Sequence, residues 1–168
     1  MILRPATAAD IEMLEYWDTK PHVRDAGADG EWYDWEAEIP ASSEFSEILI
    51  AEAAGRPIGV VQIIDPKHEE SHYWGDAPEN LRAIDIWIGE EDDLGKGYGT
   101  QMMQLALARC FAAAAVTAVW LDPLVANTRA HAFYERLGFE RVDERTFGND
   151  LCYVYELTRE RFEAMHEA

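Results

Sequence analysis

Basic residues are scarce in this chain. Lysine and arginine together number 14 against 33 aspartates and glutamates, which gives a formal net charge of -19. A field of this sign repels the phosphates of nucleic acids and anionic membrane surfaces, whereas it attracts small polycations. We therefore expect no nucleic-acid and no membrane partner. Two explanations of the charge stay open: attraction of a cationic ligand, and an acidic coat of the kind that a salt-adapted organism selects.

Cysteines and long apolar runs are few as well. Cys110 and Cys152 lie far apart inside apolar patterns, so they indicate buried free thiols rather than a metal site. The longest nonpolar stretch, residues 110–121, is interrupted by Thr117 and is too short to span a bilayer. The first residues, MILRPATAADIEML, place charges and a proline where a signal peptide needs an apolar core. We expect a soluble, cytoplasmic protein without a metal ion.

The remaining composition is that of a folded domain. With 168 residues, of which 48% are hydrophobic, the chain is long enough for one domain, residues 1–168, with a substantial core. No internal repeat or low-complexity tract interrupts it. The patterns predict alternating elements. Strands are expected at 1–5, at 47–65 as two runs joined in a hairpin at 54–56, at 82–90 and 118–122, and twice near the C-terminus. Helices are expected from Thr7, at 31–39, 97–114 and 127–137 and at the C-terminus, and loops at 18–31 and 66–81.

Two adjacent segments carry the first sign of chemistry. The strand RAIDIWIGE alternates strictly, so Ile84, Ile86 and Ile88 share one face while Asp85 and Trp87 lie on the other. LGKGYGT, residues 94–100, follows where the strand pattern gives way to a helix pattern. Backbone N–H groups without side chains in the way can close around a phosphate at a helix start, and a plain tight turn is the alternative.

A second motif completes the pattern. In VANTRAHAFYERLGF, Asn127 and Tyr134 are seven positions apart, about two helical turns, so they project from one side of a helix. Together with the strand and glycine loop upstream, this resembles the GCN5-related N-acetyltransferase (GNAT) superfamily, from ILRPATAAD to YVYEL. The resemblance implies an α+β fold: a mixed, mostly antiparallel sheet of six to seven strands, splayed between strands 4 and 5 and flanked by helices. It also implies transfer of an acyl group from coenzyme A to an amine.

The resemblance assigns expected sites for acetyl-CoA. The glycine loop and the start of the following helix would wrap the pyrophosphate. The strand end would bind the pantetheine arm, and an N–H near Ile88 would polarise the thioester carbonyl. Asn127 would hold the cofactor's amide chain. Leu94 stands where the family usually has Gln or Arg, although leucine also occurs there in one subfamily. The expected cofactor residues are Trp87, Ile88, Gly89, Leu94, Gly95, Lys96, Gly97, Tyr98, Gly99, Thr100 and Asn127.

Two residues are the expected catalytic groups. Tyr134 would protonate the departing coenzyme A sulfur, and Asp85 would remove a proton from the amine, directly or through water, or fix the cationic amine. The alternatives are a tyrosine in the core of an amphipathic helix and a carboxylate that only accepts structural hydrogen bonds.

The acceptor amine is predicted from a closer resemblance, to the aminoglycoside 6'-N-acetyltransferases. It is carried by AIDIWIGE with LGKGYGT, by the loop containing HYWGD, and by LDPLVANTRAHAFYERLGF. An aminoglycoside carries several ammonium groups, so its site should combine carboxylates with aromatic walls. Each candidate alone is alternatively a surface residue, and Trp32 and Trp35 are alternatively core residues. The candidates are Trp32, Trp35, Glu36, Tyr73, Trp74, Asp76, Asp85, Asp122 and Asp150.

The sequence therefore predicts an acetyltransferase that moves an acetyl group from acetyl-CoA to a primary amine of a polycationic small molecule, the 6'-amino group of an aminoglycoside, with antibiotic resistance as the outcome. The alternatives are another amine (a polyamine, an amino-acid derivative or a protein N-terminus) and a non-catalytic acyl-CoA sensor. Either a monomer or a homodimer is compatible with the sequence.

Overall fold

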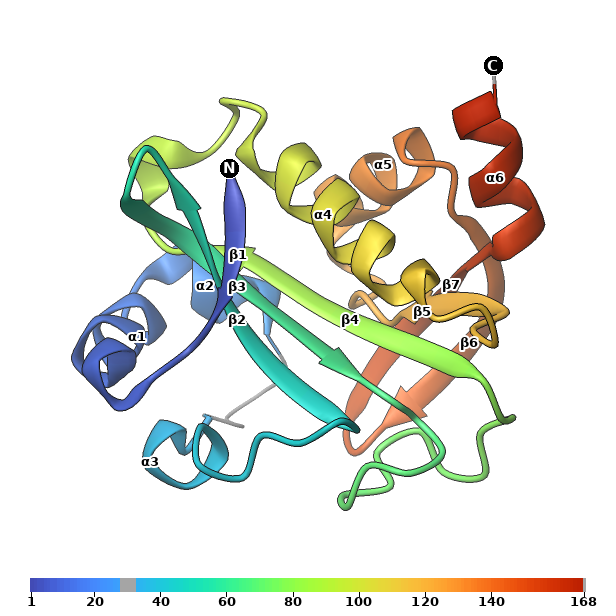
Figure 1. Cartoon of the computed structure of the whole chain (residues 1–168), viewed down its shortest axis with the longest axis horizontal. Coiled ribbons are helices and arrows are strands. Elements are labelled where there is room, and N and C mark those ends of the chain that lie inside the picture. Colours follow the sequence, from blue (N-terminus) through green and yellow to red (C-terminus); the bar gives the residue numbers. More distant parts are fainter. Residues whose placement is uncertain (28–32, 168) are drawn as a thin grey trace.

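A seven-stranded sheet forms the centre of the computed structural model, which describes residues 1–27 and 33–167 (Figure 1). The strand order is β1-β2-β3-β4-β5-β7-β6. The strands are β1 (Ile2–Pro5), β2 (Ser46–Ala53), β3 (Arg56–Ile64), β4 (Leu81–Ile88), β5 (Ala118–Leu121), β6 (Glu140–Phe147) and β7 (Asp150–Thr158).

Helices cover both faces of this sheet. On one face α4 packs on the strands together with side chains from α5 and α6, and on the other face α1 and α3 pack over β2 and β3 (Figure 1). The helices are α1 (Ile11–Asp18), α2 (Pro21–Ala26), α3 (Trp35–Glu38), α4 (Tyr98–Ala112), α5 (Thr128–Arg136) and α6 (Arg159–Glu167), with short 3-10 turns η1 (Ala8–Asp10) and η2 (Glu91–Asp93).

The pairing of β4 with β5 stops early. All neighbouring strands are antiparallel except β4 and β5, which run parallel and pair only through residues 81–83 and 118–120. On its other side β4 stays paired with β3 as far as Ile88. The two middle strands therefore diverge after Ala83, and a gap opens along the second half of β4. The predicted α+β class and the splay between the fourth and fifth strands are confirmed.

The core consists of two apolar layers. Met102, Met103 and Ala106 of α4 are fully buried against one face of the sheet. Leu14 of α1 and Trp35 of α3 are buried against the other. Because both faces of β2 and β3 are covered, their sequences read as nearly continuous apolar runs rather than as a strict alternation.

Of three predictions near the N-terminus, the structure confirms one and corrects two in detail. The expected loop at 18–31 contains α2. Its N-cap Lys20 is extended and Pro21 is its first residue, a position where proline costs no hydrogen bond. The helix expected from Thr7 is confirmed: Thr7 is the N-cap of the 3-10 turn η1, which continues into α1 at Ile11. Of the expected helix at 31–39, only Trp35–Glu38 is helical, and part of the range lies outside the described residues.

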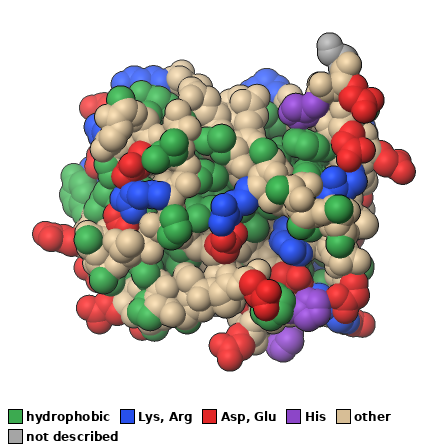
Figure 2. Space-filling model, in the orientation of Figure 1, with side chains coloured by type: hydrophobic (Ala, Val, Ile, Leu, Met, Phe, Trp, Pro, Cys, Tyr) green, Lys and Arg blue, Asp and Glu red, His purple; other side chains and the backbone are tan. Residues whose placement is uncertain are grey.

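The surface matches the acidic composition without being uniformly negative. On the face seen in Figure 2, acidic side chains lie mostly around the outline, while several basic side chains lie among hydrophobic ones in the middle. Among the helices that the structure describes, none combines the length and apolar character that a membrane crossing requires.

The end of β4 depends on a close contact that only glycine allows. A Cβ on Gly89 would lie 2.0 Å from a ring carbon of Trp17. We predict that Gly89→Ala lowers the free energy of unfolding by about 1–3 kcal/mol, because the strand end or the indole must shift. Urea denaturation measures this. Gly27→Ala is the control, since a Cβ there meets its nearest atom at 3.7 Å, and equal losses in both variants would contradict the prediction.

Candidate active site

The end of β4 directs backbone polar groups into the gap. The Gly89 N–H donates to the Ile58 carbonyl at 2.9 Å and continues the ladder with β3. Because successive residues of a strand point their N–H groups to opposite sides, the N–H and C=O of Ile88 face away from β3, toward the gap. His22 of α2 lies 2.9 Å from the Ile88 carbonyl, so its Nε2 carries the hydrogen that it donates. α2 is thereby attached to the strand end.

The glycine loop follows at the start of α4. Gly95 and Gly97 have φ values of +71° and +81°, a region that favours glycine, and a Cβ at either position would meet no atom within 4 Å. Gly97 is the N-cap of α4 and offers no side chain to the first-turn N–H groups, which lack acceptors within the helix. The loop therefore leaves open space beside several backbone donors and the positive end of a helix dipole, an arrangement suited to an anion such as a diphosphate.

An ion pair between a buried carboxylate and an exposed guanidinium holds this loop in place. Asp93 is 3% exposed and accepts two hydrogen bonds from Arg56, at 2.7 and 2.9 Å. Arg56 is the first residue of β3, so the pair ties the loop to the β2–β3 hairpin. The guanidinium lowers the pKa of Asp93, so this carboxylate stays charged and paired at neutral pH and its charge is compensated beside the proposed anion site.

Carboxylates and phenols gather on the two sides of the gap. Asp85 projects from β4, and Asp122 directly follows β5. The Tyr33 hydroxyl lies 3.3 Å from Asp85 Oδ2, and the Tyr73 hydroxyl donates to Asp122 Oδ2 at 2.5 Å. Tyr134 of α5 is half-buried against the α4 side of the core.

These groups influence one another electrostatically. Asp85 is exposed to solvent, and partial desolvation by the neighbouring protein atoms raises its pKa, which the Tyr33 hydrogen bond opposes. Desolvation, with repulsion from Asp85, raises the pKa of Asp122 to about 8, although the Tyr73 hydrogen bond opposes this. Desolvation and the same two carboxylates also raise the pKa of Tyr134, so its phenol keeps its proton at neutral pH. The site thus contains two carboxyl groups that readily accept a proton and a phenol that can donate one.

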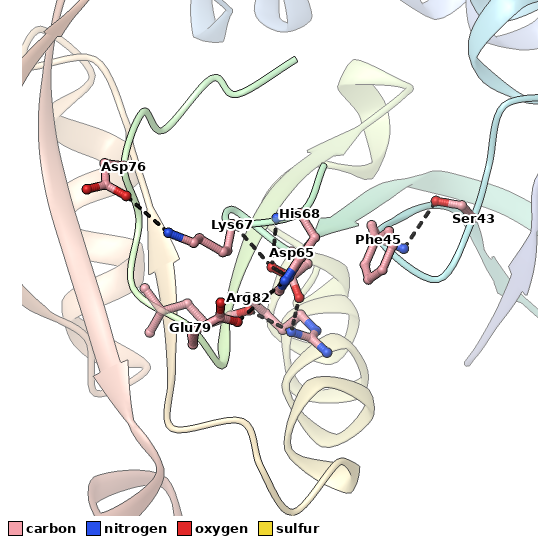
Figure 3. Close-up of polar contacts among 9 residues, drawn as sticks. Ser43, Phe45, Asp65, Lys67, His68, Asp76, Glu79 and Arg82 are labelled. Carbon is pink, nitrogen blue, oxygen red and sulfur yellow. Dashed lines mark hydrogen bonds and ion pairs between the residues drawn. The ribbon is translucent and has the colours of Figure 1, made fainter. Parts of the chain in front are cut away.

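The loop that brings Tyr73 here is anchored by a polar network (Figure 3). Asp65, 6% exposed, accepts hydrogen bonds from the backbone N–H groups of Lys67 and His68 and from Arg82. His68 lies between Asp65 and Glu79, at 3.1 and 3.5 Å. These contacts join both ends of the loop, and the Tyr73 ring further stacks on Phe147 with centroids 4.6 Å apart. The network fixes the phenol that contacts Asp122.

The structure separates the predicted substrate residues into two groups. Asp85, Asp122 and Tyr73 come together at the gap, and Tyr134 lies within their electrostatic influence. The others lie elsewhere or outside the described residues. Trp35 (2% exposed) and Trp74 (5%) are core residues, Asp76 is on the surface beside Lys67, Glu36 is exposed, Asp150 is half-buried at the start of β7, and Trp32 is outside the described residues.

The predicted cofactor residues have local roles as well. Asn127 is the N-cap of α5 and accepts from the Ala130 N–H at 3.2 Å, which fixes the helix start. The Trp87 ring packs against Tyr33 and Trp35 on the side of Asp85. Lys96 is mostly exposed, with its ammonium 4.0 Å from Asp93.

Three contacts at the site were not predicted from the sequence: those of His22, Tyr33 and Gln62. Tyr33 donates to Gln62 Oε1 at 2.8 Å and also reaches Asp85. Tyr33 lies between Trp32 and Trp35 in the segment EWYDWEAEI, and nothing in that sequence distinguishes its ring from those of its neighbours. Among the residues that the structure describes, no group of three or more His, Cys, Asp and Glu side chains is placed to hold a metal ion.

Comparison with known proteins gives consistent matches. The family model described as an acetyltransferase (GNAT) domain matches residues 6–147. Aminoglycoside N(6')-acetyltransferase type 1 of Klebsiella pneumoniae is 28% identical over 175 residues, covering 96% of this chain and 84% of that protein. The kanamycin resistance protein of Rhizobium radiobacter is 31% identical over 96 residues, covering 56% of this chain and 89% of that protein.

Solved structures agree with this match. The crystal structure of aminoglycoside acetyltransferase AAC(6')-Ib in complex with coenzyme A superposes with a TM-score of 0.86 at 29% identity, over 98% of each chain. The structure of AAC(6')-Ib with coenzyme A and kanamycin gives a TM-score of 0.86 at 28% identity, also over 98% of each chain.

The raised pKa of Asp122 has a consequence for stability. An acid whose pKa is higher in the folded state stabilises the fold below its unfolded pKa, and this contribution is lost as pH rises through the folded value, here about 8. The free energy of unfolding of the parent protein should therefore fall as the pH rises from about 4 to about 8. We predict that it falls less in Asp122→Asn. Denaturation midpoints across this range measure it. Asp76→Asn, which removes an exposed carboxylate, is the control, and parallel pH curves for the parent and Asp122→Asn would contradict the prediction.

Proposed function

Because the chain belongs to the acetyltransferase (GNAT) family, we propose that it transfers the acetyl group of acetyl-CoA to a primary amine of a polycationic small molecule, namely the 6'-amino group of an aminoglycoside. The observation that carries this proposal is the cluster of two carboxyl groups and three phenols beside the gap between β4 and β5. The matches to aminoglycoside acetyltransferases over nearly the whole chain support it. Such an activity confers antibiotic resistance.

Acetyl-CoA supplies an activated thioester when bound, and this chain offers a matching set of backbone groups. The N–H groups at the start of α4 and the open glycine loop would hold the diphosphate, with Arg56 keeping Asp93 neutralised nearby. The Ile88 N–H, directed into the gap, would donate to the thioester carbonyl oxygen and stabilise the negative charge that develops there.

Asp85 is the proposed acceptor for the amine proton. An amine needs a free electron pair to attack a thioester, and a carboxylate with a raised pKa is better suited to take up the proton than an ordinary surface aspartate. Asp122, across the gap, would bind a further part of the cation and keep the amine oriented. Binding of the positively charged ligand would also relieve the repulsion between the two carboxylates.

Tyr134 is the proposed proton donor to the leaving sulfur. Its phenol is protonated at neutral pH, and its ring is partly buried against the core that includes α4. The amine proton would move to Asp85 while a different proton leaves Tyr134, so acid and base are separate groups on the two sides of the gap.

Aromatic rings beside these carboxylates suit a sugar with ammonium groups. Tyr33 and Tyr73 each place a hydroxyl on one of the two carboxylates and a ring beside it. Ring faces and carboxylates together stabilise a cation whose carbon framework is partly apolar. We take residues 1–168 to act as one acetyltransferase domain, in the cytoplasm where acetyl-CoA is available, as a monomer or a homodimer.

The substrate class is tested by coenzyme A release with kanamycin, spermidine and a peptide with a free N-terminus. We predict that kanamycin gives the highest kcat/KM. Turnover of spermidine or the peptide alone would assign the same chemistry to another amine. Binding of acetyl-CoA without release in any reaction would indicate a sensor rather than an enzyme.

The role of Tyr134 is tested by removing its hydroxyl. We predict that Tyr134→Phe lowers kcat with kanamycin by roughly 10²- to 10⁴-fold, because the leaving thiolate loses its proton donor, while acetyl-CoA binding changes little. Steady-state kinetics and calorimetry measure the two quantities. The control is Tyr16→Phe, which removes an exposed hydroxyl on α1. An unchanged kcat in Tyr134→Phe would exclude the phenol as the acid.

A further inference from the structure

The Tyr33 hydroxyl lies between two acceptors that belong to paired strands. Gln62 of β3 and Asp85 of β4 are register partners, so their side chains project side by side from one face of the sheet. Tyr33 lies 2.8 Å from Gln62 Oε1 and 3.3 Å from Asp85 Oδ2. A phenol has one hydrogen, so it can donate to only one of these two oxygens at a time.

The ring that carries this hydroxyl is held by stacking. Tyr33 stacks on Trp35, with centroids 4.6 Å apart and planes within 12°, and on Trp87 at 5.5 Å. Trp35 is 2% exposed, and its Nε1–H donates to Asp18 at 2.7 Å. The ring therefore has little freedom to move, and the adjustable part of the contact is the direction of the O–H bond.

We propose that Tyr33 is a positioning residue that follows the protonation of Asp85, donating to Asp85 while that carboxylate is charged and to Gln62 once Asp85 carries the amine proton. In the second state the new carboxyl O–H donates to the Tyr33 oxygen, so every group keeps a partner. The amine proton ends on Asp85, and the Tyr33 proton stays on its own oxygen. This inference rests on the proposed function for the source of the proton, but the hydrogen-bond switch belongs to the free protein.

The surroundings are consistent with a proton shared in this way. The Tyr33 hydrogen bond lowers the pKa of Asp85, against the larger rise from desolvation, while desolvation and the charges of Asp85, Glu38 and Asp122 raise the pKa of Tyr33 itself. Tyr33 therefore stays protonated when Asp85 ionises. The other titratable groups around Asp85 are Asp122, Cys152, Tyr73 and Tyr134, whose pKa values all rise partly because of the Asp85 charge.

Two substitutions separate the two hydrogen-bond states. Tyr33→Phe keeps the ring but removes the donor to ionised Asp85, so the pKa of Asp85 should rise, on the order of one unit. Gln62→Leu leaves the phenol no acceptor except Asp85, which favours the ionised state, so the pKa of Asp85 should fall. Tyr16→Phe is the matched control for loss of a phenol hydroxyl and should leave this titration unchanged.

The titration is followed in the free protein by NMR of the Asp85 side-chain carboxyl carbon, which needs neither acetyl-CoA nor an amine. Opposite shifts in Tyr33→Phe and Gln62→Leu support the switch, because a merely structural role would not reverse the sign. Shifts in the same direction, or no shift in Tyr33→Phe, overturn it.

Kinetics then connect the switch to the reaction. With kanamycin, the acid limb of kcat/KM should move to higher pH in Tyr33→Phe and to lower pH in Gln62→Leu, with the KM for acetyl-CoA unchanged. The ionisation of kanamycin is common to all variants, so the differences report on the protein. If the NMR shifts occur but the parent protein does not acetylate kanamycin, the proposed substrate fails while the switch stands.

Discussion

The early end of pairing between β4 and β5 is the constraint on which the rest of the structure depends. Backbone N–H and C=O groups in the middle of a sheet normally have partners, and leaving them open is costly unless water or a ligand supplies them. Here β4 is paired with β3 from Ala83 to Ile88, so its second edge can stay open without the strand losing its position. His22, Gly89 and the close contact with Trp17 hold the end of this strand. A ligand with amide groups, such as the pantetheine arm, would complete the interrupted ladder.

The gap also has two carboxyl groups near each other, those of Asp85 and Asp122. Asp85 and Asp122 come from strands that separate, and desolvation raises the pKa of each. Two such carboxyl groups are unfavourable for the empty protein and favourable once a cation lies between them. The net charge of -19 adds a weaker, longer-range attraction for the same kind of ligand. Local geometry and overall composition therefore favour the same class of substrate.

The elements that the sequence predicted well are those with a local cause. The alternation around Asp85 determined its face, and the positive φ angles of Gly95 and Gly97 agree with the need for glycine in the loop. The mixed sheet and the gap between its fourth and fifth strands followed from the family resemblance rather than from any periodicity. The α2 helix was missed because its sequence is rich in residues typical of loops, and its contact with Ile88 is made only in the folded chain.

The surroundings of individual side chains were harder to predict than the helices and strands. The aromatic segment around residue 33 contains several rings of similar chemistry, and only the packing shows that Trp35 enters the core while Tyr33 reaches Asp85. Gln62 acquires its place from the register of β3 against β4, which no local pattern specifies. Trp74 was expected at the substrate and instead packs on Trp120, because the anchored loop directs Tyr73 outward and the indole inward.

The account is tested most directly by a crystal structure of this protein with coenzyme A and kanamycin bound together. It predicts the pantetheine arm along the open edge of β4, the diphosphate at residues 95–100, the 6'-amino group beside Asp85, and the Tyr134 hydroxyl within about 3 Å of the sulfur. Coenzyme A bound outside the gap, or an amine placed away from both Asp85 and Asp122, would contradict it.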